Sequence, residues 1–190
     1  MNLQNKYSLS EIIEGCQKTD RRFQELLYKM MASKMLGVCM RYAKTKFEAE
    51  DILQTGFIKV FKHIQSYKAE GSFEGWIRRI MVNTSIEFYR KSMRTLNVLD
   101  IEETGVEISS SEIELSSIQA KDLMTLIQSL SEVYRMVFNM YAIEGYSHKE
   151  IANTLGITEG ASKVQLSRAR TVLKEKIKKL ERQGYEVNVG

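Results

Sequence analysis

The stretch SHKEIANTLGITEGASKVQLSRAR, residues 147–170, decides the fold of the C-terminal part of the chain. Ser147-x-x-Glu150 is a capping box that opens a short helix, and Gly156 supplies the left-handed residue that ends it. Thr158 can cap a second helix directly after this turn. Two helices joined by so short a turn predict a helix-turn-helix. An ordinary helical hairpin with the same caps is the alternative that this stretch leaves open.

The second helix of this pair has two different faces. At 3.6 residues per turn, one face is apolar and should be buried; its residues are Leu166, Ala169, Leu173 and Ile177. The opposite face is small, polar and basic, with no acidic residue between Glu159 and Glu175. Such a face suits the major groove of duplex DNA, where N-terminal residues meet base edges and arginines meet phosphates.

The first half of the sequence is also helical. An apolar period of 3.6 predicts a helix over residues 23–43. Thr45-x-x-Glu48 is a second capping box, and it opens a helix whose apolar stripe includes Phe57 and ends at Ile64. Ser72 is expected to cap a third helix over residues 73–93. Its core stripe is expected to hold Phe73, Trp76, Ile77, Ile80, Thr84 and Phe88, and its opposite stripe carries Arg79, Asn83 and Arg90.

Charge divides the chain into three segments. Residues 1–94 carry a net charge of +7, residues 95–118 carry −6 and residues 119–190 carry +3. The acidic segment has no helical period and is rich in Ser, so we expect a flexible linker. Segments 121–130 and 132–143 are amphipathic and helical. The sequence therefore predicts an all-α protein of two small helical domains, 1–94 and 119–190, joined by the acidic linker 95–118.

The basic domains favour a polyanion such as nucleic acid as partner, although solvated helix faces account for part of such an excess. No apolar run is long enough for a bilayer, and the N-terminus lacks the layout of a signal peptide, so we expect a cytoplasmic protein without membrane insertion. Cys16 and Cys39 are expected to be buried thiols. We find no catalytic constellation, so we expect no enzyme activity, no metal and no cofactor. His63 and His148 are isolated and are interpreted as surface or helix-end residues.

Three segments of the sequence together resemble the sigma-70 family of bacterial RNA polymerase sigma factors, and its extracytoplasmic-function group in particular. They are AEDILQTGFIKVFKHIQSY and SFEGWIRRIMVNTSIEFYRK in the first half and IEGYSHKEIANTLGITEGASKVQLSRAR in the second. The resemblance covers roughly residues 20–92 and 118–180. It implies a region 2-like bundle, a region 4-like helix-turn-helix and a role in promoter recognition and transcription initiation.

The resemblance implies two sets of site residues in the first domain. The set that docks on the polymerase core is Asp51, Gln54, Phe57 and Ile58. Asp51 could instead be an acid that stabilises the helix N-terminus. The set that binds the opened −10 strand and captures a flipped base is Tyr67, Ser72, Phe73, Trp76, Arg79, Asn83 and Arg90. Trp76 could equally be a core residue.

In the second domain the resemblance implies contacts with the −35 duplex by Lys163, Val164, Gln165, Ser167, Arg168 and Arg170. The sequence departs from the commonest pattern at two positions. Ser162 stands where Val or Ile is usual, which should weaken the apolar seam slightly. Gln165 stands where Arg is usual, and it would favour adenine over guanine.

The partners implied are the beta and beta' subunits of RNA polymerase, promoter DNA and an anti-sigma factor. We expect the acidic linker to mimic nucleic acid in a basic channel of the polymerase. A stand-alone helix-turn-helix regulator is the alternative function, and a nucleic-acid-modifying enzyme is a more distant one.

Overall fold

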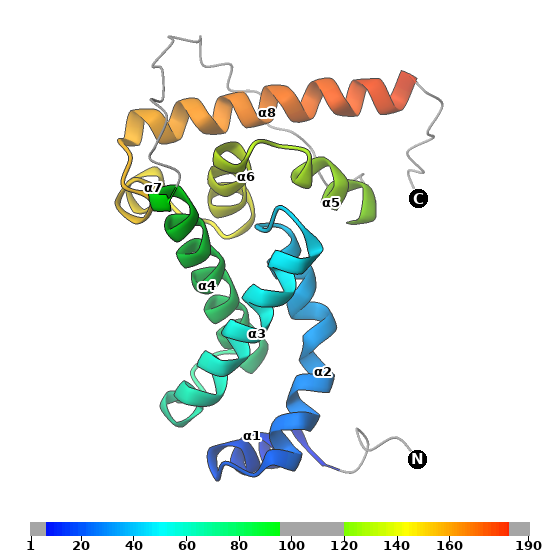
Figure 1. Cartoon of the computed structure of the whole chain (residues 1–190), viewed down its shortest axis with the longest axis vertical. Helices are drawn as coiled ribbons and strands as arrows, with labels where there is room; N and C mark the ends of the chain where they lie inside the picture. Colours follow the sequence, from blue (N-terminus) through cyan, green and yellow to red (C-terminus); the bar gives the residue numbers. More distant parts are fainter. Residues whose placement is uncertain (1–6, 96–119, 183–190) are drawn as a thin grey trace. The chain divides into compact units, whose positions relative to one another are not determined.

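The computed structural model describes residues 7–95 and 120–182, and these form two compact units, Met1–Lys91 and Ser92–Gly190. Each unit is built of helices, and the described ranges contain no strand, which confirms the all-α prediction (Figure 1). The division falls three residues before the expected domain end at 94, and α4 continues to Thr95. Beyond Thr95, the predicted acidic linker lies outside the described residues.

The first unit is a bundle of α2 (Arg21–Met40), α3 (Lys46–His63) and α4 (Phe73–Thr95). The Thr45 hydroxyl accepts a hydrogen bond from the Glu48 backbone N–H at 3.1 Å, so the predicted cap opens α3. Because Gly56 has no side chain, α3 approaches α4 closely; a Cβ there would lie 2.3 Å from Sδ of Met81. The fully buried core includes Leu27, Met35, Ile52, Ile64, Ile77 and Met81.

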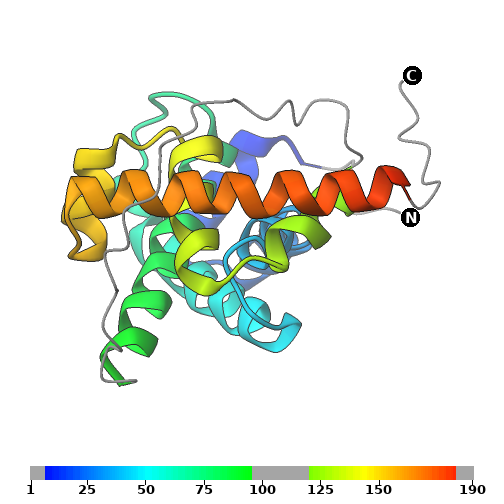
Figure 2. The same cartoon turned by 90° about the horizontal axis from the view of Figure 1, so that it is seen from above.

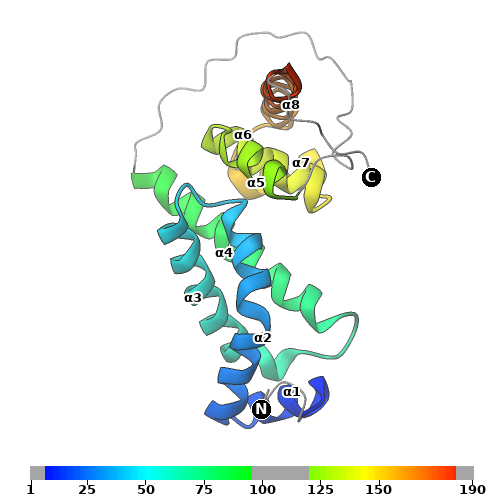
Figure 3. The same ribbon diagram turned by 90° about the vertical axis from the view of Figure 1, so that its right-hand side faces the viewer.

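A helix that the sequence pattern did not predict, α1 (Leu9–Gln17), lies across one end of α2 (Figure 3). It begins with a capping box between Ser8 and Glu11. Its last residue, Gln17, is hydrogen-bonded to the short 3-10 helix η2 (Ile64–Ser66). The Gln17 side chain donates to the Ile64 carbonyl at 3.3 Å, and the Gln65 side chain donates back to the Gln17 carbonyl. These two hydrogen bonds fix the start of the loop between α3 and α4.

In the second unit the long helix α8 (Glu159–Arg182) packs along α5 (Ala120–Gln128), α6 (Glu132–Phe138) and α7 (His148–Leu155) (Figures 1 and 2). The predicted helix over 132–143 is divided, because α6 passes into a π-helical turn, η3 (Asn139–Ile143). The core of the unit includes Ile127, Met136, Val137, Phe138, Met140, Ile151, Ala169 and Leu173. Buried Arg135 donates to the Gln128 carbonyl at 3.2 Å, near the end of α5.

The turn between α7 and α8 has the predicted chemistry. The Ser147 and Glu150 side chains each accept from the other's backbone N–H, at 3.2 and 2.8 Å. Gly156 ends α7 at φ 73°, in the left-handed region that only glycine adopts freely. The Thr158 hydroxyl accepts from the Ala161 N–H at 3.0 Å and caps α8.

Cys16 and Cys39 are free and buried, as predicted. Burial raises the pKa of the Cys16 thiol to about 11 and that of Cys39 to about 12. Among the helices of residues 7–95 and 120–182, none combines the length and the apolar character that a bilayer span requires.

Candidate functional sites

An exposed strip runs along α3, and we call Phe47, Asp51, Gln54 and Ile58 the α3 strip. These positions follow one another at offsets of four, three and four residues, so they share one side of the helix. Phe47 and Ile58 at its two ends are 74% and 68% exposed, although both are large and apolar. Phe47 was not predicted to lie on a docking surface. The feature that could have indicated it is an apolar residue that lies inside the capping box Thr45–Glu48 and outside the apolar stripe of the helix.

Phe57 does not belong to this strip, and its predicted contact with the polymerase core stays a prediction. It is only 2% exposed, and its ring lies 4.7 Å from that of Tyr28 and 6.0 Å from that of Phe61. The physical reason is helical geometry, because adjacent residues project about 100° apart and Ile58 takes the outward direction.

Asp51 is half-buried and lies in the sixth position of α3. The field of a helix N-terminus falls off within its first turn, so the alternative of a dipole-stabilising acid is weak for Asp51. Beside the strip, a groove of about 250 Å³ separates α2 from α3. It is lined by Tyr28, Ala32, Ser33, Leu36, Glu50, Leu53 and Gln54.

The loop before α4 contains one hydrogen bond between its two ends and one residue in a strained backbone conformation. The Tyr67 hydroxyl donates to the Gly71 carbonyl at 3.0 Å, and Ala69 adopts φ 58°, a left-handed conformation that costs a non-glycine residue about 1–2 kcal/mol. Ser72 caps α4, as predicted, by accepting from the Gly75 N–H at 3.0 Å. Backbone strain held by surrounding contacts is common at binding sites.

Three aromatic rings gather behind this loop. The Tyr67 ring lies 4.9 Å from Phe73 and 5.4 Å from Trp76, and Phe73 stacks on Trp76 at 5.6 Å. Phe73 is 3% exposed, which confirms its predicted place in the core stripe of α4, whereas its predicted contact with a DNA strand stays a prediction. Trp76 is half-buried, so it belongs to the cluster and still presents part of its ring outside.

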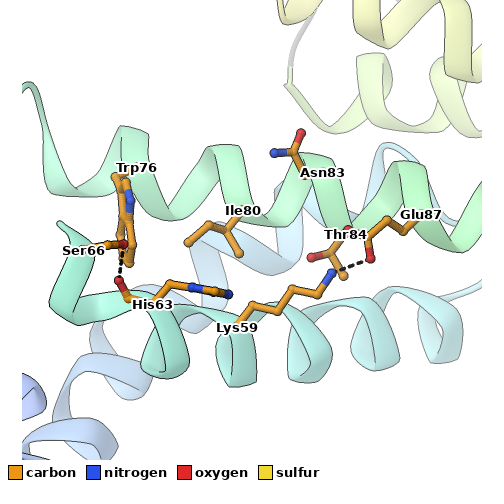
Figure 4. Close-up of a pocket in the computed structure, with 8 residues that line it drawn as sticks. All are labelled: Lys59, His63, Ser66, Trp76, Ile80, Asn83, Thr84 and Glu87. Atoms are coloured by element: carbon orange, nitrogen blue, oxygen red, sulfur yellow. Dashed lines mark hydrogen bonds and ion pairs between the residues drawn. The ribbon is translucent and has the colours of Figure 1, made fainter. Parts of the chain in front are cut away.

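A pocket of about 300 Å³ opens between α3 and α4 (Figure 4). Its lining residues are Lys59, His63, Ser66, Trp76, Ile80, Asn83, Thr84 and Glu87. Trp76, Ile80 and Thr84 point from α4 toward α3 in the close-up, whereas Asn83 points away from α3 and borders the rim. Trp76 and Asn83 belong to the set predicted to bind the −10 strand, whereas Lys59 and His63 of α3 were not predicted to line a site.

The pocket combines one charged pair with one unsatisfied hydroxyl. Lys59 Nζ lies 2.5 Å from Glu87 Oε2 and bridges the two helices. The Thr84 side chain is 0% exposed, and its Oγ1 has no hydrogen-bond partner among the described residues. A buried hydroxyl without a partner costs free energy. Arg79 and Arg90, on the predicted outer stripe of α4, are exposed.

On α8 the structure places most of the predicted contact residues at the surface. Lys163 is exposed, and Val164, Ser167, Arg168 and Arg170 are half-exposed. Gln165 is only 4% exposed, and its Oε1 has no hydrogen-bond partner among the described residues. Its position on the helix is that of the buried stripe, and the predicted contact of Gln165 with a base stays a prediction.

Ser162 and His148, separated by 14 positions in the sequence, meet at the start of α8. Ser162 is 0% exposed, and its Oγ lies 2.9 Å from Nδ1 of His148. The His148 ring stacks on Tyr141 at 4.5 Å, and the Arg170 guanidinium lies 5.9 Å from the centre of the Tyr141 ring. His148 is the first residue of α7, which confirms its interpretation as a helix-end residue, but these contacts show that it is not isolated. Burial, with the charge of Lys163, lowers the pKa of His148.

Comparison with known families gives two matches. The model of sigma-70 region 2 matches residues 27–95, and the model of sigma-70 region 4 matches residues 120–173. Together they include the α3 strip, the pocket and most of α8, whereas α1 lies before the first match.

Comparison with individual proteins agrees. The chain is 31% identical over 157 residues to the ECF RNA polymerase sigma factor SigE of Mycolicibacterium smegmatis, over 80% of this chain and 61% of that protein. It is 25% identical over 186 residues to the ECF RNA polymerase sigma-E factor of Haemophilus influenzae, over 89% of this chain and 95% of that protein. Among solved structures, the sigma factor RpoE of Bartonella quintana, in complex with the anti-sigma factor NepR, is similar at 20% identity and a TM-score of 0.46, over 81% of this chain and 96% of that chain.

Proposed function

This chain belongs to the sigma-70 family of RNA polymerase sigma factors, in its extracytoplasmic-function group, and from that premise we propose that it directs RNA polymerase to specific promoters and starts transcription there. One observation carries this conclusion over a stand-alone regulator. Regions 2 and 4 both match, in that order, in one chain. A regulator that only binds duplex DNA needs a helix-turn-helix but has no use for region 2.

The α3 strip is the part of the proposal that concerns the polymerase core. Two exposed apolar ends flank one carboxylate and one amide, which is the composition of an interface with an apolar anchor and polar specificity. Burying the two apolar side chains against a partner would contribute about 1.5–3 kcal/mol each. We therefore assign core docking to Phe47, Asp51, Gln54 and Ile58, without Phe57.

The pocket between α3 and α4 is the proposed site for an unpaired base of the −10 strand. Its volume of about 300 Å³ is at the lower end of the range for small-ligand pockets. Trp76 offers an aromatic face for stacking, and the exposed Asn83 amide at the rim offers hydrogen bonds to a base edge. Exposed Arg79 and Arg90 would bind phosphates of the same strand. Holding a base outside the duplex offsets the cost of unpairing it, and so favours melting.

The outer face of α8 is the proposed site for the −35 duplex. Lys163 and Arg168 supply charge for phosphates or guanines, and Val164 and Ser167 are small enough to let the helix enter the major groove. The proposed contact surface does not include buried Gln165, and the preference for adenine that its side chain suggested stays a prediction.

In this proposal the chain acts by binding alone and catalyses no reaction. The binding free energy is divided among three contacts, with the polymerase core, the −10 strand and the −35 duplex. Two DNA-binding units on one chain raise the effective concentration of the second contact once the first is made. The segment between the units, whose charge is −6 over residues 95–118, is proposed to follow a basic channel of the polymerase. An anti-sigma factor is proposed to inhibit by covering the α3 strip.

The decisive experiment mixes the purified chain with core RNA polymerase and a library of random DNA. Co-elution with the core, followed by transcripts from a selected set of sequences, is the expected result. Ile58→Glu should weaken co-elution at least tenfold, whereas Glu14→Gln, an exposed change on α1, should leave it unchanged. Tight binding to duplex DNA with no affinity for the core would instead favour the stand-alone regulator.

A further inference from the structure

Four side chains from three elements form a continuous line in the second unit. Ser162 of α8 contacts His148, the first residue of α7; His148 stacks on Tyr141 of η3; and Tyr141 lies under Arg170 of α8. The line therefore starts and ends on the same helix, two turns apart, and passes through α7 and η3. We call Ser162, His148 and Tyr141 the bridge to Arg170.

The first link of the bridge satisfies a buried hydroxyl. Ser162 is 0% exposed, and the hydroxyl of a serine in an apolar seam costs free energy unless it has a partner. Nδ1 of His148 at 2.9 Å is that partner. Because the contact also fixes the orientation of the imidazole ring, it determines where the ring can stack.

The last link acts on the side chain of Arg170. An arginine side chain loses roughly 2 kcal/mol of rotamer freedom when it is ordered. A guanidinium that already rests over an aromatic ring has lost part of that freedom before DNA arrives, so less is lost on binding. Tyr141 is 36% exposed, so the guanidinium that it supports stays at the surface.

We propose that Ser162, His148 and Tyr141 are positioning residues that hold Arg170 ready for a phosphate of the duplex bound by α8. The inference rests on the proposed function in one respect, the assignment of α8 to duplex DNA. It assigns no direct DNA contact to the bridge itself. Charged groups near His148 are Lys163, Glu159 and Arg170.

The first test measures binding of the full chain to a labelled duplex of random sequence at low salt, where phosphate contacts dominate affinity. Tyr141→Leu removes the ring and should weaken binding about threefold, the size of an exposed cation–π contact. Tyr141→Phe keeps the ring and should bind like the wild type. In an Arg170→Gln background, Tyr141→Leu should have no further effect, because its influence passes through the guanidinium.

The second test exchanges the polar pair for an apolar one. His148→Phe leaves the buried Ser162 hydroxyl unpaired, and Ser162→Val leaves Nδ1 unpaired, so each alone should weaken duplex binding about three- to tenfold. The double variant replaces both polar atoms and keeps a ring against Tyr141, so binding should return to within about twofold of the wild type. This recovery keeps the test valid even if one single variant folds poorly.

The outcomes separate this inference from the proposed function. Equal loss on Tyr141→Leu in both Arg170 backgrounds would mean that the ring acts on the fold alone, and the bridge would be rejected. Tighter binding by Tyr141→Leu would also overturn it, because the ring would then hold Arg170 away from DNA. Failure of the wild type to bind the duplex, or to yield transcripts with core polymerase, would instead overturn the proposed function.

Discussion

Thr84→Val is expected to stabilise the first unit. Thr84 is 0% exposed, and its Oγ1 has no hydrogen-bond partner among the described residues. In mutational data, a buried hydroxyl without a partner costs about 1–3 kcal/mol. Valine has nearly the same shape and a similar helix propensity, so it leaves no cavity and removes that cost. We expect the free energy of unfolding of this unit to rise by about 1–2 kcal/mol.

The assay is urea unfolding followed by tryptophan fluorescence. Trp76 is the single tryptophan of the chain and lies in the first unit, so its signal reports this unit alone. With a slope of about 1–1.5 kcal/mol per molar urea, the midpoint should rise by about 1 M. An unchanged slope is needed for the shift to be interpreted as stability.

Ser85 provides a matched control one residue away. It is also buried, but its hydroxyl donates to the Met81 carbonyl at 2.9 Å. Ser85→Ala should therefore give no gain, with a change between zero and a loss of about 1 kcal/mol. A lower midpoint for Thr84→Val would refute the reasoning, because it would mean that the hydroxyl has a partner in solution.

Three further changes test other parts of the fold. Gly156→Ala should destabilise the second unit by about 1–2 kcal/mol in thermal unfolding, because φ 73° is a left-handed conformation that strains alanine. Gly37→Ala is the control: the added Cβ would meet nothing within 4 Å, so the first unit should not be destabilised. Cys16 and Cys39 should resist a thiol reagent at about pH 8 until urea unfolds the chain, because burial raises both pKa values and the thiolate is the reactive form. The pKa of His148 in the folded chain lies below its ordinary value of 6.5, so on acidification the unfolded chain binds the proton first. The stability of the second unit should therefore fall as the pH drops through 6.5 toward the folded pKa. His148→Phe should lessen this fall.

Helical periodicity and capping signals predicted the helices of both units except α1, and periodicity was the better guide to burial where two lines of reasoning overlapped. Phe57 and Phe73 belonged both to an apolar core stripe and to a binding surface suggested by resemblance, and the structure buries both. A family pattern gives which positions recur, but not whether a residue acts directly or by supporting its neighbour. Exposure separates the two cases, as it does for Phe57 and Ile58.

The features that the sequence did not predict depend on contacts between distant segments. The capping box of α1 at Ser8 and Glu11 could have been found in the sequence, but the nine residues of this helix are too few for a clear apolar period. The hydrogen bond between α1 and η2 joins positions 48 residues apart, so no local pattern indicates it. The π-helical turn η3 inserts buried Asn139 into an amphipathic pattern without disturbing its apolar period. Gln165 was expected to contact DNA because of the family resemblance, yet its side chain is buried at a core position of α8.

Position 162 shows why a residue cannot be evaluated apart from its partner. By itself, serine in a seam where valine or isoleucine is usual predicts a weaker seam. In the structure the hydroxyl is bound by His148, and that imidazole would in turn be an unsatisfied, half-buried group beside a valine. Each residue is costly without the other, so the path from this pair to an apolar pair passes through a less stable single variant in either order. The free energy that matters at this site therefore belongs to the pair, and a coupling of zero between Ser162 and His148 in a double-mutant cycle would contradict the contact itself.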